Sequence, residues 1–317
     1  MIMIKKITDL GEKIRMAGTI RKLGMLTALA AVLVLGALLT AFSHTDTGVA
    51  TRIYSRGGSL TINLTEVPQE VADDAARLAM EMFGDYGKNY ENFVSQLLGT
   101  YVEARDKDVV MFFNAGGWGW NSLEASPGWR SIFNGIEGEL NDLGYTTLLL
   151  DYQRTELTAR GIIDEFVELM RVYPSKSEAL AYRVEFLTRH IRGVKVIVTG
   201  ESDGTVITDS VMNILQDNQR VYSIQTGPPF WHRTIAKDRT LVMDDNGRHP
   251  DTFTRGEVAT MIWTSIQEAA GVPQPPENTG RVLFFLRAPG HDYQWGYPEV
   301  SSQISNFLKT NLGYNQG

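Results

Sequence analysis

The sequence contains no cysteine in its 317 residues. Disulfide bonds, thiolate metal ligands, cysteine nucleophiles and lipid attachment at cysteine are therefore excluded. No block of lysine and arginine follows the N-terminal region, and the formal net charge is −7, which argues against nucleic acid as a partner. Internal repeats and low-complexity tracts are also absent. A hydrophobic content of 43% with 21% charged residues is typical of an ordinary folded protein.

An uncharged apolar stretch runs from Met25 to Phe42. Its 18 residues come close to the roughly 20 that a helix needs to cross a bilayer. Six lysines and arginines precede it, against Asp9 and Glu12, which predicts that the leader stays in the cytoplasm and that the rest of the chain is exported. We expect an uncleaved single-pass anchor. Ala41-Phe42-Ser43 also fits a cleavage site, and cleavage there would release a secreted protein.

The sequence divides into four predicted parts. Residues 1–22 form a basic cytoplasmic leader, residues 23–43 a transmembrane signal-anchor helix, residues 44–107 a stalk, a short hairpin and a helical segment, and residues 108–317 a catalytic core. The hairpin is expected within residues 51–66, around Gly57-Gly58. Gly84 and Gly87 are expected to break the helical pattern of residues 67–105 into two helices.

Beyond residue 108, short apolar runs alternate with helical patterns. Strands are expected at residues 109–114, 146–151, 194–199, 221–225, 240–243 and 282–286, and helices at residues 131–143, 158–172, 177–192, 205–216, 256–270 and 299–312. This alternation predicts an α/β fold with a mostly parallel sheet and helices on both faces. Ligands of such sheets bind beyond the carboxyl ends of the strands, so the loops that follow the strands are where a site is expected.

One of these loops, Gly200-Glu201-Ser202-Asp203-Gly204, matches the G-x-S-x-G nucleophile elbow. It lies between a predicted strand and a predicted helix, and its glycines suit a backbone that doubles back tightly. Ser202 is the candidate nucleophile. The backbone N–H of Asp203, at the start of the helix, is a candidate oxyanion donor. The alternative is an ordinary turn that contains a serine.

The remaining catalytic groups should follow in the order serine, acid, histidine. His291, in the loop before the last predicted helix, is the candidate general base; alternatively it caps or packs against that helix. Asp244, Asp245 and Asp251 are all candidate acids. Asp251 is slightly favoured over Asp245, because Asp245 begins an Asp-Asn-Gly turn. These aspartates and Asn246 are alternatively calcium ligands, although their spacing is not that of an EF-hand.

The loop after the first core strand, Ala115-Gly116-Gly117-Trp118, is expected to supply a second oxyanion donor from the backbone of Gly116, Gly117 or Trp118. The alternative is a glycine-rich turn with packed tryptophans. Aromatic residues in the loops are expected either to line an acyl or aromatic pocket or to belong to the core: Trp118, Trp120, Phe230, Trp231 and Trp295. Glu201 is expected to be solvated, and His232 and His249 are expected to be ordinary loop residues.

The strand order, the GESDG elbow, the NAGGWGW loop and the late PGHDY segment resemble those of the α/β-hydrolase superfamily. The resemblance extends from about Asp108 to the C-terminus. It implies that Ser202 attacks an acyl carbon, that His291 takes the proton and that an aspartate orients the imidazole. It implies neither a metal nor an organic cofactor. The 40 or so helical residues that precede the core depart from the usual pattern of the superfamily.

The sequence therefore predicts a membrane-anchored serine hydrolase that acts outside the cytoplasmic membrane. The expected substrate is a small or lipid-like carboxylic ester, thioester or amide, cleaved through an acyl-enzyme on Ser202. The aromatic loops favour an esterase over a peptidase. The alternative is a catalytically silent fold of the same type that serves as a binding or scaffold module in a membrane assembly. The substrate, the role of residues 67–105 and the oligomeric state stay open.

Overall fold

The computed structural model describes residues 52–55, 67–156, 158–235, 238–275, 280–283 and 286–313. The chain divides into two units, residues 1–47 and residues 48–317, and every described residue belongs to the second. The predicted leader and transmembrane helix, and residues 56–66 of the predicted hairpin, lie outside the described residues. Within the described ranges, no helix has the length and apolar character needed to cross a membrane.

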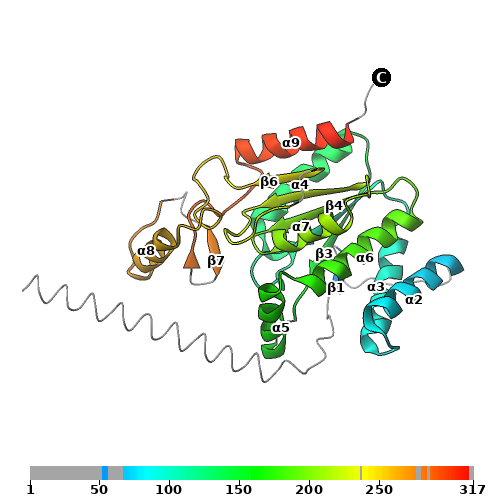
Figure 1. Ribbon diagram of the computed structural model, residues 1–317. Helices are drawn as coiled ribbons and strands as arrows, with labels where there is room; N and C mark the ends of the chain where they lie inside the picture. The colour runs from blue at the N-terminus through cyan, green and yellow to red at the C-terminus, as the bar shows by residue number, and fades with distance from the viewer. Residues whose placement is uncertain are drawn as a thin grey trace, which may run out of the picture. The chain divides into compact units, whose positions relative to one another are not determined.

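A six-stranded sheet forms the centre of the second unit, in the order β1-β3-β2-β4-β5-β6 (Figure 1). Strands β2 to β6 run parallel, and β1 pairs antiparallel with β3 at one edge. The predicted mostly parallel sheet is therefore confirmed. The strands are β1 (Arg52–Ser55), β2 (Val109–Asn114), β3 (Thr147–Gln153), β4 (Lys195–Glu201), β5 (Val221–Thr226) and β6 (Thr240–Met243).

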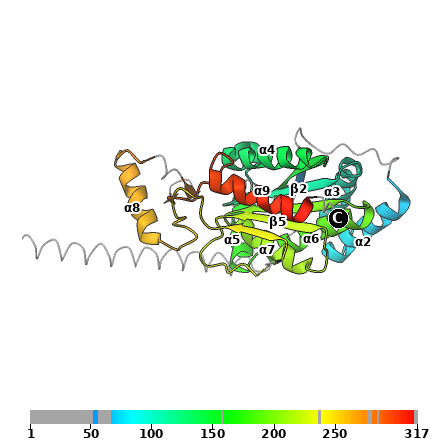
Figure 2. The same cartoon turned by 90° about the horizontal axis from the view of Figure 1, so that it is seen from above.

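Helices cover both faces of the sheet (Figure 2). Helices α6 and α7 pack on one face, and α4 and α9 pack on the other. Helix α5 packs beside α6. The bounds are α4 (Pro127–Asp142), α5 (Ala159–Met170), α6 (Pro174–His190), α7 (Gly204–Ile214) and α9 (Pro298–Leu312), with a 3-10 turn η2 (Leu123–Ala125) before α4.

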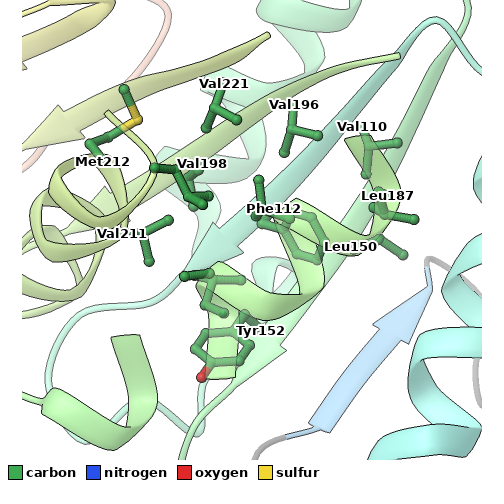
Figure 3. Close-up of a cluster of buried hydrophobic side chains, with 14 of the residues drawn as sticks. Val110, Phe112, Leu150, Tyr152, Leu187, Val196, Val198, Val211, Met212 and Val221 are labelled. Atoms are coloured by element: carbon green, nitrogen blue, oxygen red, sulfur yellow. The ribbon is translucent and has the colours of Figure 1, made fainter. Parts of the chain in front are cut away.

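The side chains of the central strands alternate between two cores. In β2, Val110 and Phe112 pack towards α6 and α7, whereas Met111 and Phe113 pack towards α4 and α9. Figure 3 shows Val110 and Phe112 beside Val196 and Val198 of β4 in the first of these cores. Because both faces are covered, β2 is apolar from Val109 to Phe113 and β4 from Val196 to Val198, and these runs could be recognised in the sequence.

Residues 67–105 form two helices, α2 (Gln69–Phe83) and α3 (Lys88–Ala104). Gly84, with a φ of 71°, ends α2 in the left-handed conformation, as expected for a glycine at a helix C-terminus. Apolar residues of both helices pack against α6, where Phe186 is fully buried. These helices and β1 thus lie in the same compact unit as the remaining strands.

The prediction that residues 282–286 form a strand of the main sheet is wrong. Strands β7 (Arg281–Leu283) and β8 (Leu286–Arg287) instead pair antiparallel as a separate two-stranded sheet. This sheet packs beside α8 (Val258–Ala269), and Glu268 of that helix forms ion pairs with Arg281 and Arg287. Periodicity could not separate the two cases, because a short apolar run suits a central strand and a small packed hairpin equally well.

The path of the chain brings two loops together at one point of the sheet. From β2 the chain moves to β3 on one side, and it later returns to β4 on the other side. The carboxyl ends of β2 and β4 are therefore neighbours, and Asn114 pairs with Gly200. This is the switch point at which open α/β sheets bind their ligands.

Candidate active site

Ser202 occupies a sharp turn between β4 and α7. Its φ of 52° lies in the left-handed region, which costs a non-glycine residue roughly 1–3 kcal/mol. Its N–H donates to the carbonyl of Thr226, at 3.0 Å. A Cβ atom on Gly200 would lie 2.7 Å from the carbonyl oxygen of Gly204, and one on Gly204 would lie 2.2 Å from that of Asn114. Both glycines are therefore required for this turn, which has the form of a nucleophile elbow.

His291 and Asp251 form a buried pair. The Nδ1 atom of His291 lies 2.8 Å from Oδ2 of Asp251, and the aspartate is completely buried. The Tyr293 hydroxyl donates to the same oxygen at 2.9 Å. The backbone N–H groups of Phe253 and Thr254 donate to Oδ1 at 2.9 and 3.2 Å. The three donors other than His291 fix the orientation of the carboxylate and, through it, the orientation of the imidazole.

The other candidate acids lie elsewhere. Asp245 accepts a hydrogen bond from the N–H of Gly247 at 2.6 Å, so its carboxylate closes the predicted turn. Asp244 is exposed. Asn246 bonds the carbonyl of Asp292, at 2.8 Å. The structure thus brings Asp251 to His291 and leaves Asp244 and Asp245 apart from it. No cluster of three carboxylate or histidine ligands for a metal ion occurs in the part of the chain that the structure describes.

Gly227 connects the acid–base pair to the serine. It follows Thr226, whose carbonyl accepts the N–H of Ser202. A Cβ atom at Gly227 would lie 2.6 Å from Cε1 of His291 and 3.0 Å from Oδ2 of Asp251. The imidazole therefore lies directly against the backbone that holds the serine. Ser202 Oγ is buried and has no hydrogen-bond partner among the described residues.

The loops that carry the acid and the base are bonded to each other. Thr252 donates from its N–H and from its hydroxyl to the carbonyl of Pro289, both at 3.0 Å. The side chain of Asn246 donates to the carbonyls of Gly290 and Asp292 at 3.2 and 2.8 Å. A Cβ atom on Gly290 would lie 2.4 Å from the carbonyl oxygen of Pro250, so the two backbones are in direct contact. These contacts join residues 246–252 to residues 289–292.

The charges around His291 favour its protonated form. Burial by itself lowers the pKa of His291, but the charge and hydrogen bond of Asp251, with smaller contributions from Glu201 and Asp203, outweigh burial and raise it. The pKa of Asp251 is lowered, because the positive imidazole and the donated hydrogen bonds outweigh the effect of its own burial. Burial raises the pKa of Asp203 to about 6, although the charges of Arg154 and His291 oppose this.

The loop after β2 lies against the serine, as predicted. A Cβ atom on Gly116 would lie 2.9 Å from Cβ of Ser202. The backbone N–H of Gly116, however, donates to the carboxylate of Glu201, which is half-buried rather than solvated. The prediction of solvation was wrong because it ignored this loop. The N–H groups of Gly117, Trp118 and Asp203 are then the ones left for an oxyanion.

Arg154, which sequence reasoning missed, holds this loop from behind. Its guanidinium is completely buried and donates to Oδ1 of Asn114 at 3.0 Å, to the carbonyl of Ala115 and to the carbonyl of Gly117 at 2.6 Å. Its Nε donates to Glu165 at 2.7 Å. The planar guanidinium thus donates to three acceptors in the loop that faces Ser202: the side chain of Asn114 and the carbonyls of Ala115 and Gly117.

The charge of Arg154 is paired with Glu165, which belongs to a buried network. Glu165 also accepts hydrogen bonds from Lys176, at 2.9 Å, and from the hydroxyl of Thr155, at 2.5 Å. Burying an ion costs several kcal/mol, whereas each hydrogen bond to a charged group returns about 1.5–3 kcal/mol. Gain and cost nearly cancel, so the clearest effect of the network is on the position of the loop.

The five aromatic pocket candidates divide into three groups. Trp118, at the end of the predicted oxyanion loop, stacks with Trp120, and their ring centroids are 6.0 Å apart. Phe230 and Trp231 are half-exposed. Trp295 packs against α4, where a Cβ atom on Gly135 would lie 2.0 Å from its ring. The pocket assignment of Trp295 was therefore wrong, because the sequence does not show that Gly135 leaves a space for it.

The two other loop histidines have local roles. His232 lies 3.0 Å from Oδ2 of Asp209, a completely buried residue of α7. The same carboxylate accepts the N–H of Ile235 at 2.9 Å. This contact fastens the loop after β5 to α7. The Nδ1 atom of His249 lies 2.8 Å from the carbonyl of Pro250.

No protein-family model matches the sequence, and no curated protein matches it. Among solved structures, the chain is similar to a Trichoderma reesei cutinase in complex with a C11Y4 phosphonate inhibitor. The sequence identity is 10%, the TM-score is 0.39, and the alignment covers 79% of this chain and 94% of that chain.

The class of fold follows from the topology and site of this chain itself. The elbow after β4, the aspartate after β6 and the late histidine occur in the order serine, acid, histidine. This order, on a mostly parallel sheet with helices on both faces, is the arrangement of α/β hydrolases.

The raised pKa of His291 predicts the pH dependence of any reaction that uses it as a base. A protonated imidazole accepts no proton, so kcat/KM for a short-chain ester should fall as the pH drops through a midpoint above about 6.5. Asp203→Asn removes a charge that favours the imidazolium and should move this midpoint to lower pH. The exposed Asp217→Asn is the matched control. An unchanged midpoint in Asp203→Asn would contradict the electrostatic account.

The bonds of Arg154 predict a positioning role. Arg154→Lys keeps the charge beside Glu165 but cannot bond Asn114, Ala115 and Gly117 together. We expect kcat to fall by about 100-fold, as for loss of an oxyanion donor, with a much smaller change in KM. Arg183, another buried arginine, bonds Gln96 and Ala179. Arg183→Lys should leave kcat unchanged; equal losses in the two variants would mean that only stability is affected.

Proposed function

We propose that this protein is a serine hydrolase that forms an acyl-enzyme on Ser202. The observation that carries the proposal is the buried Asp251–His291 pair, packed on Gly227 beside a serine with positive φ. A histidine that only packed against the last helix would have no need of a carboxylate held by three further donors. The same pair leaves Nε2 of the imidazole available for the serine hydroxyl.

The proposed reaction assigns one task to each group. Ser202 Oγ attacks the acyl carbon while His291 Nε2 takes its proton, and the carbonyl oxygen becomes an oxyanion. The N–H of Asp203, with that of Gly117 or Trp118, stabilises this oxyanion. His291 then gives the proton to the leaving alcohol, thiol or amine. Water attacks the acyl-enzyme by the same route and releases the acid.

A carboxylic ester or thioester is the favoured substrate, ahead of an amide or peptide. Trp118, at the end of the oxyanion loop, stacks with Trp120, and a row of aromatic rings leads from His291 to Trp231. Apolar walls of this kind suit an acyl or aromatic group.

The nucleophile is tested by fluorophosphonate labelling of the full-length protein. The parent should be labelled, whereas Ser202→Ala and His291→Ala should not. Asp251→Asn should slow labelling by up to about 10⁴-fold, because the imidazole loses the acceptor that fixes its tautomer. Asp245→Asn is the matched control and should react like the parent.

Circular dichroism of each variant separates loss of chemistry from loss of fold. A folded parent that reacts with no fluorophosphonate and hydrolyses no ester would overturn the proposal and favour the silent binding module.

We also propose that the hydrolase is attached to the extracytoplasmic side of a membrane by residues 23–43. The proposal is supported by the 18 uncharged residues from Met25 to Phe42 and by the basic leader. The expected result is that the protein stays in the membrane fraction after carbonate washing and that mass spectrometry finds residues 1–22 intact. A mature chain beginning near His44 would instead mean cleavage and secretion.

A further inference from the structure

Helix α8 is oriented opposite to the usual surface helix. Val258, Ile262 and Ile266 recur every four residues on its exposed side, and Trp263 lies next to them. The exposed fraction of the side chain is 43% for Val258, 49% for Ile262, 54% for Ile266 and 61% for Trp263. A surface helix normally turns such residues towards the core.

The side of α8 that faces the protein is mostly polar. Ser265 accepts the N–H of Arg287 at 2.8 Å, and Glu268 forms ion pairs with Arg281 and Arg287. Thr264 is buried and bonds within the helix, and only Met261 adds an apolar side chain to this face. The polar contacts fix the helix in this rotation, so the apolar face cannot turn inwards without breaking them.

Aromatic contacts lead from the candidate active site to the residues just before α8. Phe230 and Trp231 contact each other and Phe253, with ring centroids 5.0 Å apart for the first pair and 5.3 Å for Trp231 and Phe253. The ring of Phe253 lies 4.9 Å from that of His291. Gly256, close to the start of α8, lies against Phe230: a Cβ atom there would be 3.1 Å from its ring.

The exposed large hydrophobic residues are concentrated in one part of the sequence. Of twelve exposed large hydrophobic residues in the described ranges, eight lie between Phe230 and Val272. Single exposed apolar residues are ordinary, but a gathered patch marks a surface that is covered in use. Figures 1 and 2 both show α8 set apart from the helices that cover the sheet, so it is accessible from outside.

We propose that Val258, Ile262, Trp263 and Ile266, with Phe230 and Trp231, form a docking face that inserts into the surface of a lipid bilayer. A helix with tryptophan and branched aliphatic side chains on one side is suited to the interface between headgroups and acyl chains. The inference deepens the proposed hydrolysis and rests on the proposed membrane attachment. It makes the substrate class an acyl ester presented by a lipid surface, which enters along the row of aromatic rings.

The length of the chain before β1 favours a bilayer as the occupant. Only nine residues, 43–51, separate the apolar stretch from Arg52. Fully extended, they span at most about 30 Å. An anchored domain is thus held at the membrane surface at all times, where an exposed apolar face meets lipid before it meets any other partner.

The absence of cysteine allows a direct test on the full-length chain. In a Ser202→Ala background, Ile262→Cys carries a nitroxide label, and Ile214→Cys, 51% exposed on α7 in the parent, is the matched control. The protein is reconstituted into phosphatidylcholine–phosphatidylglycerol vesicles, and flotation verifies attachment separately. We expect the ratio of oxygen to water-soluble nickel collisions to be several-fold higher at position 262 than at position 214.

The other outcomes overturn the docking face. Equal ratios at the two positions would mean that α8 stays in water. A label at position 262 that is shielded from both reagents would mean that protein covers α8. Spin–spin broadening that rises with protein density would identify a second copy of the chain, and broadening that does not rise would identify residues 25–42 of the same chain. Because the Ser202→Ala protein hydrolyses nothing, this result is independent of whether the proposed chemistry is correct.

A second measurement links the docking face to the substrate. In the active protein, the Ile262→Ser/Ile266→Ser double variant should hydrolyse a long-chain ester embedded in vesicles at least several-fold more slowly than the parent. It should hydrolyse a soluble short-chain ester at the parent rate. Equal losses on both substrates would indicate damage to the fold, and equal rates on both would contradict delivery of substrate from lipid.

Discussion

Close approach of backbones at one edge of the sheet is the constraint on which the site depends. Four glycines lie at this edge, and any Cβ atom there would come within 3 Å of a neighbour: Gly116, Gly200, Gly204 and Gly227. The absence of side chains lets the loop after β2 touch Ser202 and lets the ring of His291 rest on the backbone after β5. Each contact needs the strand order that makes β2, β4 and β5 neighbours.

A second layer of the site consists of buried charge. Arg154 touches the loop that faces the serine, and its charge is paired with Glu165 of α5, which Lys176 of α6 also contacts. Such groups add little net stability, since desolvation offsets most of their attraction. A guanidinium nevertheless fixes several acceptors in one plane, which no apolar side chain of similar size does. The loop is thereby held in place before any substrate arrives.

Local features of the sequence predicted the elbow and the strands well. Ser202 stands between glycines after an apolar run, and every ingredient of that turn lies within a few residues. The choice of Asp251 over Asp245 was also local, because the Asp-Asn-Gly turn occupies Asp245. The loops that hold Asp251 and His291, however, could be placed only relative to the predicted strands. The sequence therefore could not predict the distance between these two side chains.

Features that depend on distant packing were missed. Nothing near Arg154 shows that its side chain passes behind residues 114–117, and nothing near Trp295 shows the space above Gly135. The strand expected at residues 282–286 belongs to a separate hairpin beside α8, where Arg281 and Arg287 pair with Glu268. These contacts with α8 join residues that are distant in sequence, so the periodicity of the helix does not show them.

The bonds between residues 246–252 and residues 289–292 have a consequence for motion. Thr252 and Asn246 tie the two loops together, so the acid and the base belong to one rigid body. A motion that keeps these bonds moves Asp251 and His291 together, so it can change their distance from Ser202 without separating them from each other. In such a motion the imidazole keeps the acceptor that fixes its tautomer.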